Sequence, residues 1–319
     1  MRVLITGVSG FVGGHVARRF AERGDLVLGL GIQPAPAGLP LEDYRVADLT
    51  ALAEVETALQ ALKPDAVVNL AGQASAAKSF DDPSETFRVN TSGALVLLEA
   101  VRRAAPKARI LQVGSGESYG PLTPGSRAGE SAPFRPVSPY ALSKAAADTA
   151  GAAYAEAHGL DLVRTRSFAH TGPGQDGRFV IPSFAQQIAV LERTAEKGVL
   201  RVGNLEVTRD ISDVRDVAAA YVALLDRGAR GAAYNVCRGQ GVRLADVASR
   251  LCAMAQVPVR IEVDPARVRP VDVRYLVGDP SEIARAAGWH AAILFEQTLR
   301  DTLEDWRKRH ASEPPAASS

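Results

Sequence analysis

A tyrosine and a lysine stand four residues apart in a segment whose pattern predicts a helix. At that spacing Tyr140 and Lys144 lie on one face, one turn from each other. Ser138 is a good N-cap and Pro139 suits the first helical position, which places Tyr140 in the opening turn. The helix dipole and the lysine charge both favour phenolate there, so we expect the pKa of Tyr140 to lie below its free value of about 10. The pair predicts a general acid or base.

The same spacing also arises where a surface lysine stands beside a half-buried tyrosine, so the pair needs support from elsewhere. Ser115 supplies some, because it follows an apolar run, 108–113, that is typical of a buried strand. Ligands of open parallel sheets bind outside the carboxyl ends of the strands. The Ser115 hydroxyl could therefore hold the substrate oxygen that Tyr140 protonates, although taken alone it could equally be an ordinary loop serine.

The first residues of the chain form a strand, a glycine turn and a helix in that order. An apolar run, 1–6, leads into Gly7, Gly10 and Gly13, and a helical segment, 15–23, follows. Such glycines allow a tight turn and a close approach of a pyrophosphate to the helix N-terminus. The spacing is G-x-x-G-x-x-G rather than G-x-G-x-x-G. The context predicts dinucleotide binding.

Composition limits what the chain can be. A length of 319 residues with 46% hydrophobic content can bury a large core. The net charge of +1 implies neither a nucleic acid nor an anionic membrane as partner, and no stretch predicts a signal peptide or a membrane span. Cys237 and Cys252 both stand in apolar segments, which indicates buried thiols in a reducing cytoplasm. Five histidines without ligand spacing argue against a metal site.

Strands and helices alternate along the first half of the chain. We expect strands at 25–30, 65–71, 108–113 and 160–165, and helices at 51–62, 83–103 and 138–158. Fully apolar strands separated by helices predict an α/β fold, a Rossmann-type doubly wound parallel sheet, with a smaller C-terminal α/β lobe. The expected division is 1–166 for the dinucleotide-binding domain, with 212–237 returning to it, 167–211 and 238–311 for a substrate-binding lobe, and 312–319 for a disordered tail.

Together these residues resemble the extended short-chain dehydrogenases/reductases that act on nucleotide sugars, over nearly the whole chain. The motifs are Thr6-Gly7-x-x-Gly10-x-x-Gly13, Asp48-Leu49, Asn69-Leu-Ala-Gly72, Asn90, Ser115 and Tyr140-x-x-x-Lys144. More narrowly, a set of downstream strings resembles the family members that reduce GDP-4-dehydro-6-deoxy-D-mannose to GDP-D-rhamnose. These strings are Gly172-Pro-Gly-Gln175, Phe179-Val180, Val202-Gly-Asn204, Arg209-Asp210, Asp213-Val-Arg-Asp216, Tyr234-Asn-Val-Cys237 and Asp264-Pro-Ala-Arg267.

The resemblance implies a hydride transfer from a nicotinamide to a 4-keto carbon, with Tyr140 as proton donor, Lys144 on the nicotinamide ribose and Ser115 on the carbonyl. The cofactor-binding residues that it implies are Gly7, Ser9, Gly10, Phe11, Val12, Gly13, Asp48, Leu49, Leu70, Ala71, Gly72, Tyr140 and Lys144. The substrate-binding residues that it implies are Ser75, Ser115, His170, Phe179, Val180, Asn204, Arg209 and Arg269. Each arginine could instead form a surface ion pair, and Asp48 could cap the helix expected at 50–62 as well as bind adenine.

Gly116 and Glu117 bear on the choice between a reductase and a 4,6-dehydratase. Many dehydratases of the family carry an acid–base pair where this chain has glycine and glutamate, although some GDP-mannose dehydratases lack the acid; glycine cannot donate a proton. Glu117 is counted as a candidate catalytic residue, and a dehydratase or a 4-epimerase with tightly bound NAD(P) stays open. A non-catalytic dinucleotide-binding sensor is a third possibility, against which the retention of Ser115, Tyr140 and Lys144 argues.

Three further expectations concern the cofactor, the substrate and assembly. The segment Gly29-Leu-Gly-Ile-Gln33 lacks the carboxylate that usually binds the NAD ribose, so both NAD and NADP are tolerable and NADPH is slightly favoured. Where the family has asparagine this chain has Ala169, which leaves the exact nucleotide sugar open. Small side chains over 145–154 allow close helix approach, and relatives often form a homodimer through a four-helix bundle there.

Overall fold

The computed structural model describes residues 1–194, 197–268 and 273–311, so the tail expected to be disordered, 312–319, lies outside the described residues. Seven parallel strands form one sheet in the order β10-β6-β5-β4-β1-β2-β3. They are β1 (Arg2–Thr6), β2 (Leu26–Gly31), β3 (Asp43–Val46), β4 (Ala66–Asn69), β5 (Arg109–Ser115), β6 (Leu162–Ser167) and β10 (Ala233–Val236). The doubly wound α/β class predicted from the alternating pattern is confirmed.

Helices cover both faces of this sheet, because alternate residues of each strand point to opposite sides. In β1, Val3 and Ile5 pack in the core under α1 (Phe11–Glu22), α8 (Val214–Arg227) and α10 (Ser281–Ala287). Leu4 packs in the opposite core under α2 (Leu52–Leu62), α5 (Gly93–Ala104) and α6 (Pro139–His158). Strands buried on both faces explain the apolar runs in the sequence.

The segment expected as one helix, 83–103, is helical throughout, but a π-helical turn that was not expected interrupts its α-helical geometry. The chain forms short helices α3 (Lys78–Asp81) and α4 (Pro83–Phe87), then a π-helical turn, Arg88–Ser92, before α5 begins at Gly93. Asn90 lies in that turn and its side chain is buried. A buried amide needs partners, and those found by Asn90 lie outside its own helix.

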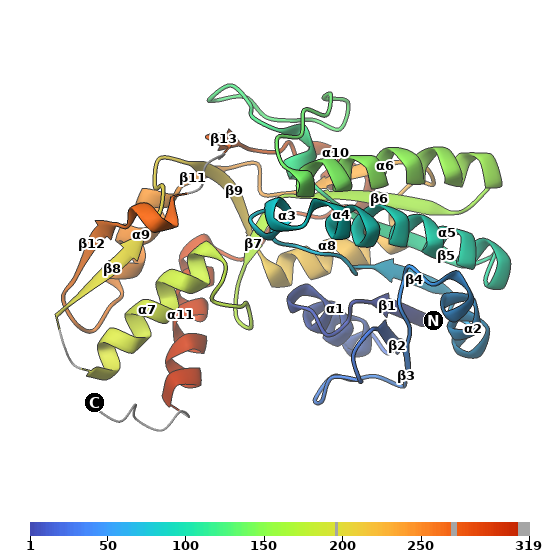
Figure 1. Ribbon diagram of the computed structural model, residues 1–319, viewed down its shortest axis with the longest axis horizontal. Helices are drawn as coiled ribbons and strands as arrows, with labels where there is room; N and C mark the ends of the chain where they lie inside the picture. The colour runs from blue at the N-terminus through green and yellow to red at the C-terminus, as the bar shows by residue number, and fades with distance from the viewer. Residues whose placement is uncertain (195–196, 269–272, 312–319) are drawn as a thin grey trace.

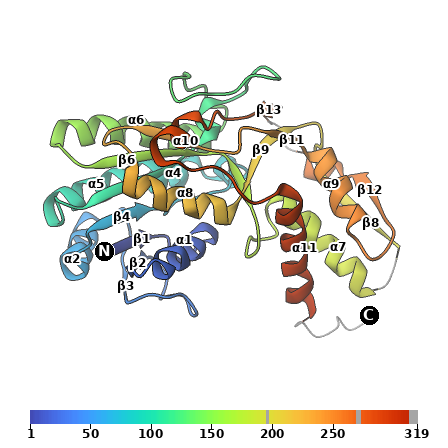
Figure 2. The ribbon, with the colours of Figure 1, turned by 180° about the vertical axis from the view of Figure 1, so that it is seen from behind.

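A second lobe lies beside the sheet, with β7 and β9 between the two parts (Figures 1 and 2). Helices α7, α9 and α11 pack around a common apolar core with the parallel pair β8 and β12. A smaller sheet joins β9 to β7, β11 and β13. The bounds of these elements are α7 (Val180–Thr194), α9 (Leu244–Ala253), α11 (Phe295–Ala311), β7 (Ala169–Thr171), β8 (Gly198–Val202), β9 (Thr208–Asp213), β11 (Gly241–Arg243), β12 (Val259–Val263) and β13 (Tyr275–Leu276).

The chain leaves the sheet after β6, builds part of the second lobe, and returns through α8 to β10, which pairs with β6. The residue limits expected for the two domains stay a prediction. Both cysteines are free thiols, Cys237 buried and Cys252 only half-buried. Within the described ranges, no helix is long and apolar enough to cross a membrane. The same ranges contain no His, Cys, Asp and Glu cluster that could hold a metal ion.

Candidate active site

The glycine turn after β1 lies against the end of β4 with no room for side chains. Gly7 has φ +66°, and a Cβ there would stand 2.9 Å from backbone atoms of Ala71. A Cβ on Gly13 would stand 2.6 Å from the Gly7 carbonyl oxygen. The turn brings the N-terminus of α1 to the rim of a cavity, and Ser9 and Val12 line it. This cradle fits a dinucleotide pyrophosphate, which a helix N-terminus attracts.

The cavity has a volume of about 990 Å³ and is lined from both parts of the molecule. Most of the residues predicted from the sequence line it. They are Gly7, Ser9, Gly10, Phe11, Val12, Gly13, Leu70, Ala71, Gly72, Ser115, Glu117, Tyr140, Lys144, His170, Phe179, Val180, Asn204 and Arg209. Asp48, Leu49 and Ser75 are not among its lining residues, and Arg269 lies outside the described residues.

Asp48 and Ser75, which do not line the cavity, both accept hydrogen bonds from neighbouring residues. Asp48 Oδ1 accepts hydrogen bonds from the backbone N and the Oγ1 of Thr50, both at 2.9 Å. Because α2 begins at Leu52 with Ala51 at its N-cap, Asp48 closes the preceding turn and does not cap the helix. Ser75 Oγ accepts from Lys78 N at 3.2 Å, at the start of α3. Their expected contacts with adenine and sugar stay predictions.

Ser115, Tyr140 and Lys144 meet at one edge of the sheet. Ser138 Oγ accepts from Ala141 N at 3.1 Å and so begins α6 as expected, which puts Tyr140 in its first turn. Ser115 is the last residue of β5, and it lines the same cavity as Tyr140. Lys144 Nζ donates to Val113 O at 3.2 Å. Two hydroxyls and an ammonium therefore converge on the cavity.

The expected lowering of the Tyr140 pKa is wrong. Burial raises the pKa of Tyr140 well above its usual value, the Glu117 carboxylate adds to the rise, and the Ser115 hydrogen bond opposes it. Burial also lowers the pKa of Lys144 to about 8. Loss of solvent outweighs the helix dipole here, and the ammonium donates its hydrogen bond to a carbonyl of β5 instead of approaching the phenol.

Asn90 is a residue to which the sequence assigned no role, although its motif was recognised. Its amide nitrogen donates to Ser143 Oγ at 3.0 Å and to Gln73 O at 3.1 Å, and its Oδ1 accepts from Gln73 N at 2.8 Å. Ser143 precedes Lys144 on α6. Asn90 thus ties the cavity wall at Gly72 and Gln73 to the helix of the reactive pair. The signal in the sequence was an asparagine in the interior of a segment expected to be helical.

Three arginines that the sequence did not assign also line the cavity. Arg178 pairs with Asp176 at 3.0 Å, Arg201 approaches Glu262 at 4.0 Å, and Arg267 approaches Asp264 at 3.4 Å. Guanidinium groups suit the diphosphate of a nucleotide sugar. Arg267 stood in a recognised string, but sequence alone does not tell a phosphate-binding arginine from one in a surface ion pair.

His170 and Phe11 connect the dinucleotide turn to the second lobe. Their rings stack with centroids 6.2 Å apart and planes 17° apart. His170 Nδ1 is hydrogen-bonded to Phe168 O at 3.0 Å, and burial lowers the pKa of its imidazole. On α1, His15 Nε2 is hydrogen-bonded to Pro173 O at 2.9 Å. The loop after β7 therefore rests on α1.

Gly116 is closed off by an aromatic ring. A Cβ on this glycine would stand 2.8 to 2.9 Å from three ring atoms of Phe168. Glu117, the next residue, lines the cavity. The segment after β5 thus presents the Glu117 carboxylate to the cavity. Beside it, the Phe168 ring leaves no space for an acidic side chain at position 116.

The geometry agrees with what the chain is similar to. A family model described as GDP-mannose 4,6 dehydratase matches residues 4–302. A GDP-6-deoxy-D-mannose reductase from Pseudomonas aeruginosa is 35% identical over 309 residues, covering 97% of this chain and 98% of the relative.

Two solved structures resemble the whole chain. The structure of RMD from Pseudomonas aeruginosa complexed with NADPH has a TM-score of 0.85 at 34% identity, covering 97% of this chain and 99% of that one. A UDP-glucose 4-epimerase from Thermus thermophilus in complex with NAD has a TM-score of 0.84 at 31% identity, covering 96% and 99%.

Proposed function

Because the chain belongs to the GDP-mannose 4,6 dehydratase family, with the fold of the extended short-chain dehydrogenases/reductases, we propose that it reduces a nucleotide-linked 4-ketosugar. The substrate that fits best is GDP-4-dehydro-6-deoxy-D-mannose, and the product GDP-D-rhamnose. The 35% identity to a GDP-6-deoxy-D-mannose reductase over nearly the whole of both chains supports this choice.

The enzyme uses a nicotinamide dinucleotide, which supplies the hydride for the 4-keto carbon. Ser115 donates a hydrogen bond to the keto oxygen and orients it. Tyr140 transfers its phenolic proton to the same oxygen as negative charge develops there. Lys144 holds the ribose next to the nicotinamide. The Gly7–Gly13 turn and the N-terminus of α1 bind the pyrophosphate.

The observation that carries reduction rather than elimination is the closed position at Gly116. Loss of the C6 hydroxyl is helped by a proton donor beside the base, and the Phe168 ring lies where the side chain of such a donor at position 116 would begin. Reduction needs only the Ser115 and Tyr140 hydroxyls and a hydride. The site supplies both hydroxyls.

The decisive assay is incubation with GDP-4-keto-6-deoxymannose and each reduced cofactor, with NMR of the product. We expect oxidation of one cofactor equivalent per sugar, and an NMR spectrum with the C4 configuration of GDP-D-rhamnose. No turnover with either cofactor overturns the proposal. That result would favour the alternative that the protein binds a dinucleotide without catalysing a reaction.

A 4,6-dehydratase is the second candidate, because Glu117 lines the cavity and could act as a base. That enzyme would carry bound NAD(P) after purification and convert GDP-mannose without added reductant. We expect neither property here. Conversion of GDP-mannose to the 4-keto-6-deoxy sugar would establish it.

For the cofactor we propose a preference for NADPH. At the end of β2 a Cβ on Gly31 would stand 2.8 Å from the Tyr44 hydroxyl oxygen, and that hydroxyl donates to Gln33 O at 2.7 Å. The tyrosine thus occupies the place from which a carboxylate would repel a 2′-phosphate. The kcat/KM with NADPH should exceed that with NADH; the reverse order contradicts the preference.

We also propose a homodimer through α5 and α6. Leu142 on α6 and Phe80 on the neighbouring α3 expose about half of their side chains (49% and 50%). Ala146 and Ala150 follow Leu142 at helical spacing and permit close helix approach. Leu142→Glu should halve the mass measured by light scattering at micromolar protein. An unchanged dimer mass, or a monomeric wild-type chain, contradicts this assembly.

A further inference from the structure

A buried carboxylate on α6 lies between two arginines of β6. Asp148 follows Tyr140 and Lys144 at helical spacing on the same face, and its side chain is only 4% exposed. Arg166 Nε donates to its Oδ2 at 3.1 Å and Arg166 Nη2 to its Oδ1 at 3.3 Å. Arg164 forms an ion pair with the same carboxylate from its other side.

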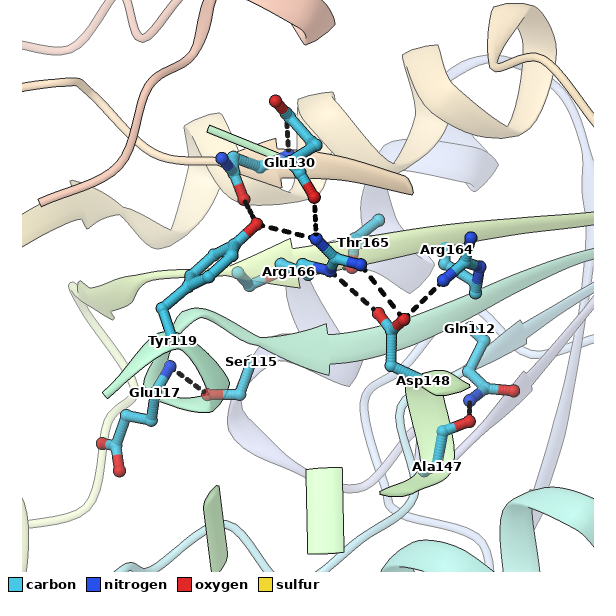
Figure 3. Close-up of polar contacts among 12 residues, drawn as sticks. Gln112, Ser115, Glu117, Tyr119, Glu130, Ala147, Asp148, Arg164, Thr165 and Arg166 are labelled. Carbon is cyan, nitrogen blue, oxygen red and sulfur yellow. Dashed lines mark hydrogen bonds and ion pairs between the residues drawn. The ribbon is translucent and has the colours of Figure 1, made fainter. Parts of the chain in front are cut away.

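The remaining guanidinium nitrogen of Arg166, Nη1, contacts residues outside α6. It donates to the Tyr119 hydroxyl at 2.9 Å and to Glu130 O at 2.6 Å (Figure 3). The guanidinium carbon lies 4.5 Å from the centroid of the Phe134 ring. The Tyr119 hydroxyl in turn donates to Asn235 Oδ1 at 2.8 Å.

Tyr119 ends the short 3₁₀ turn, Gly116–Tyr119, that begins directly after Ser115. Ser115 Oγ accepts from Glu117 N at 3.2 Å inside this turn, as Figure 3 shows. Arg166 therefore has one end on the helix that carries Tyr140 and the other on the turn that holds Ser115.

A contribution to stability does not explain why Asp148 is buried between Arg164 and Arg166. Taking a carboxylate and two guanidinium groups out of water costs several kcal/mol per ion, and well-packed apolar side chains often replace buried ion pairs without loss. A buried polar group is, however, fixed in one geometry when its donors have partners, and each guanidinium nitrogen of Arg166 has one. A displacement of about 1 Å between reacting groups lowers a rate about 10²-fold.

We propose that Arg166 is a positioning residue: it holds α6 through Asp148 and the 116–119 turn through Tyr119, and so keeps the Ser115 and Tyr140 side chains aligned at the cavity. The kinetic part of its test rests on the proposed carbonyl reduction. A spectroscopic part does not, so the two ideas can fail separately.

Tyr119→Phe is the test variant, because it keeps the ring and its volume and removes only the hydroxyl that Arg166 contacts. We expect kcat to fall about 10-fold to 100-fold, with the KM for the sugar and the Kd for NADPH within about 2-fold. If Tyr119 acts through Ser115, the two effects are not additive. In a Ser115→Ala background, Tyr119→Phe should then lower kcat by less than about 2-fold.

The matched control is Arg164→Gln. It removes the other ion pair of Asp148 but leaves the contacts with Tyr119, so kcat should stay within about 3-fold even if the melting temperature falls. Phe134→Leu is a second variant, which loosens Arg166 without touching a hydroxyl and should give a smaller loss of kcat with the same unchanged KM. If Tyr119→Phe does not fold, the kinetics of Phe134→Leu test the proposal instead.

The substrate-free measurement is the ¹³Cζ resonance of Tyr140 at neutral pH, assigned with Tyr140→Phe. It should move in Tyr119→Phe as it moves in Ser115→Ala, because both changes disturb the surroundings of the phenol, and should stay in place in Arg164→Gln. Multiplicative kinetic losses, an equal loss in Arg164→Gln, or an unmoved Tyr140 resonance in Tyr119→Phe overturns the proposal. An inactive wild-type enzyme overturns only the proposed function.

Discussion

The Tyr140 phenol is held in its protonated form, which is the form that a reduction consumes. Burial raises its pKa, so the proton stays on the oxygen at neutral pH until a stronger base appears beside it. The alkoxide that develops at the keto oxygen is such a base. A raised pKa therefore suits proton delivery, although the spacing in the sequence predicted the opposite direction.

Removal of that proton should be the most damaging single change in the site. We expect Tyr140→Phe to lower kcat by about 10²-fold to 10⁴-fold, the usual contribution of a positioned general acid, with little change in the Kd for NADPH. Steady-state kinetics and fluorescence titration with NADPH measure the two quantities. The control is Tyr154→Phe. Tyr154 lies on α6 like Tyr140, but its hydroxyl donates to Glu99 of α5, so this variant should keep normal kcat. A near-normal kcat in Tyr140→Phe would remove the phenol from the mechanism.

Lys144 gives a second prediction at this scale, on stability against pH. Burial lowers its pKa from the usual value of 10.5 to about 8 in the folded protein. Between pH 8 and pH 10.5 the unfolded chain therefore holds the proton more tightly, and stability rises with pH across that interval. Below pH 8 the lysine is charged in both states, and the cost of burying the charge is fully present.

Lys144→Met removes this titration. The wild type should gain stability relative to Lys144→Met between about pH 8 and pH 10, measured by urea unfolding of the protein without cofactor. Parallel curves for the two proteins over that interval would show that the ammonium is not buried at a cost. An exposed lysine variant, Lys107→Met, should follow the wild-type curve.

At the scale of elements, the sequence predicted where α6 begins and ends, but not the π-helical turn around Asn90. The limits of α6 follow from Ser138, Pro139 and Gly159, and the structure confirms them. The π-helical turn at Arg88–Ser92 was missed, because its cause is the set of partners that Asn90 finds on α6 and at Gln73. Contacts between segments far apart in the chain leave no period in a sequence.

The contact between Gly116, just past β5, and Phe168, just before β7, gives the prediction for this scale. Gly116→Asp, the change toward a dehydratase pair, should destabilise the protein by about 1–3 kcal/mol, because its Cβ meets the Phe168 ring. Phe168→Ala creates space and should reduce that penalty when the two changes are combined. Urea unfolding of the four proteins measures the coupling. Additive destabilisation would mean that the ring moves aside freely.

At the scale of the whole molecule, the cavity is assembled from residues between Gly7 and Leu276. The sequence predicted much of its lining through motifs, yet it left out Arg178 and Arg201, since an arginine on a surface strand or loop has no spacing that marks it. It also could not show that α1 touches the second lobe. We expect this contact to couple the binding of the dinucleotide to the binding of the substrate.

We therefore expect NADPH to tighten the binding of GDP about 5-fold or more, a coupling of ordinary size for linked sites. The His15 contact with Pro173 O and the ring stack of Phe11 on His170 transmit it. His15→Ala should bring the ratio of the two GDP dissociation constants, measured by calorimetry with and without NADPH, closer to one. His158→Ala, at the far end of α6, should keep the wild-type ratio. An unchanged ratio in His15→Ala would exclude this route.

The return of the chain to the sheet through β10 sets an order for synthesis on the ribosome. Until Ala233–Val236 emerges, β6 has no partner on its outer side, and an unpaired strand edge is a site for wrong pairing. Asn235, the acceptor for Tyr119, arrives with that same strand. The nascent chain thus acquires its nucleotide-binding turn first, and the alignment of its reacting hydroxyls only after much of the second lobe has been made.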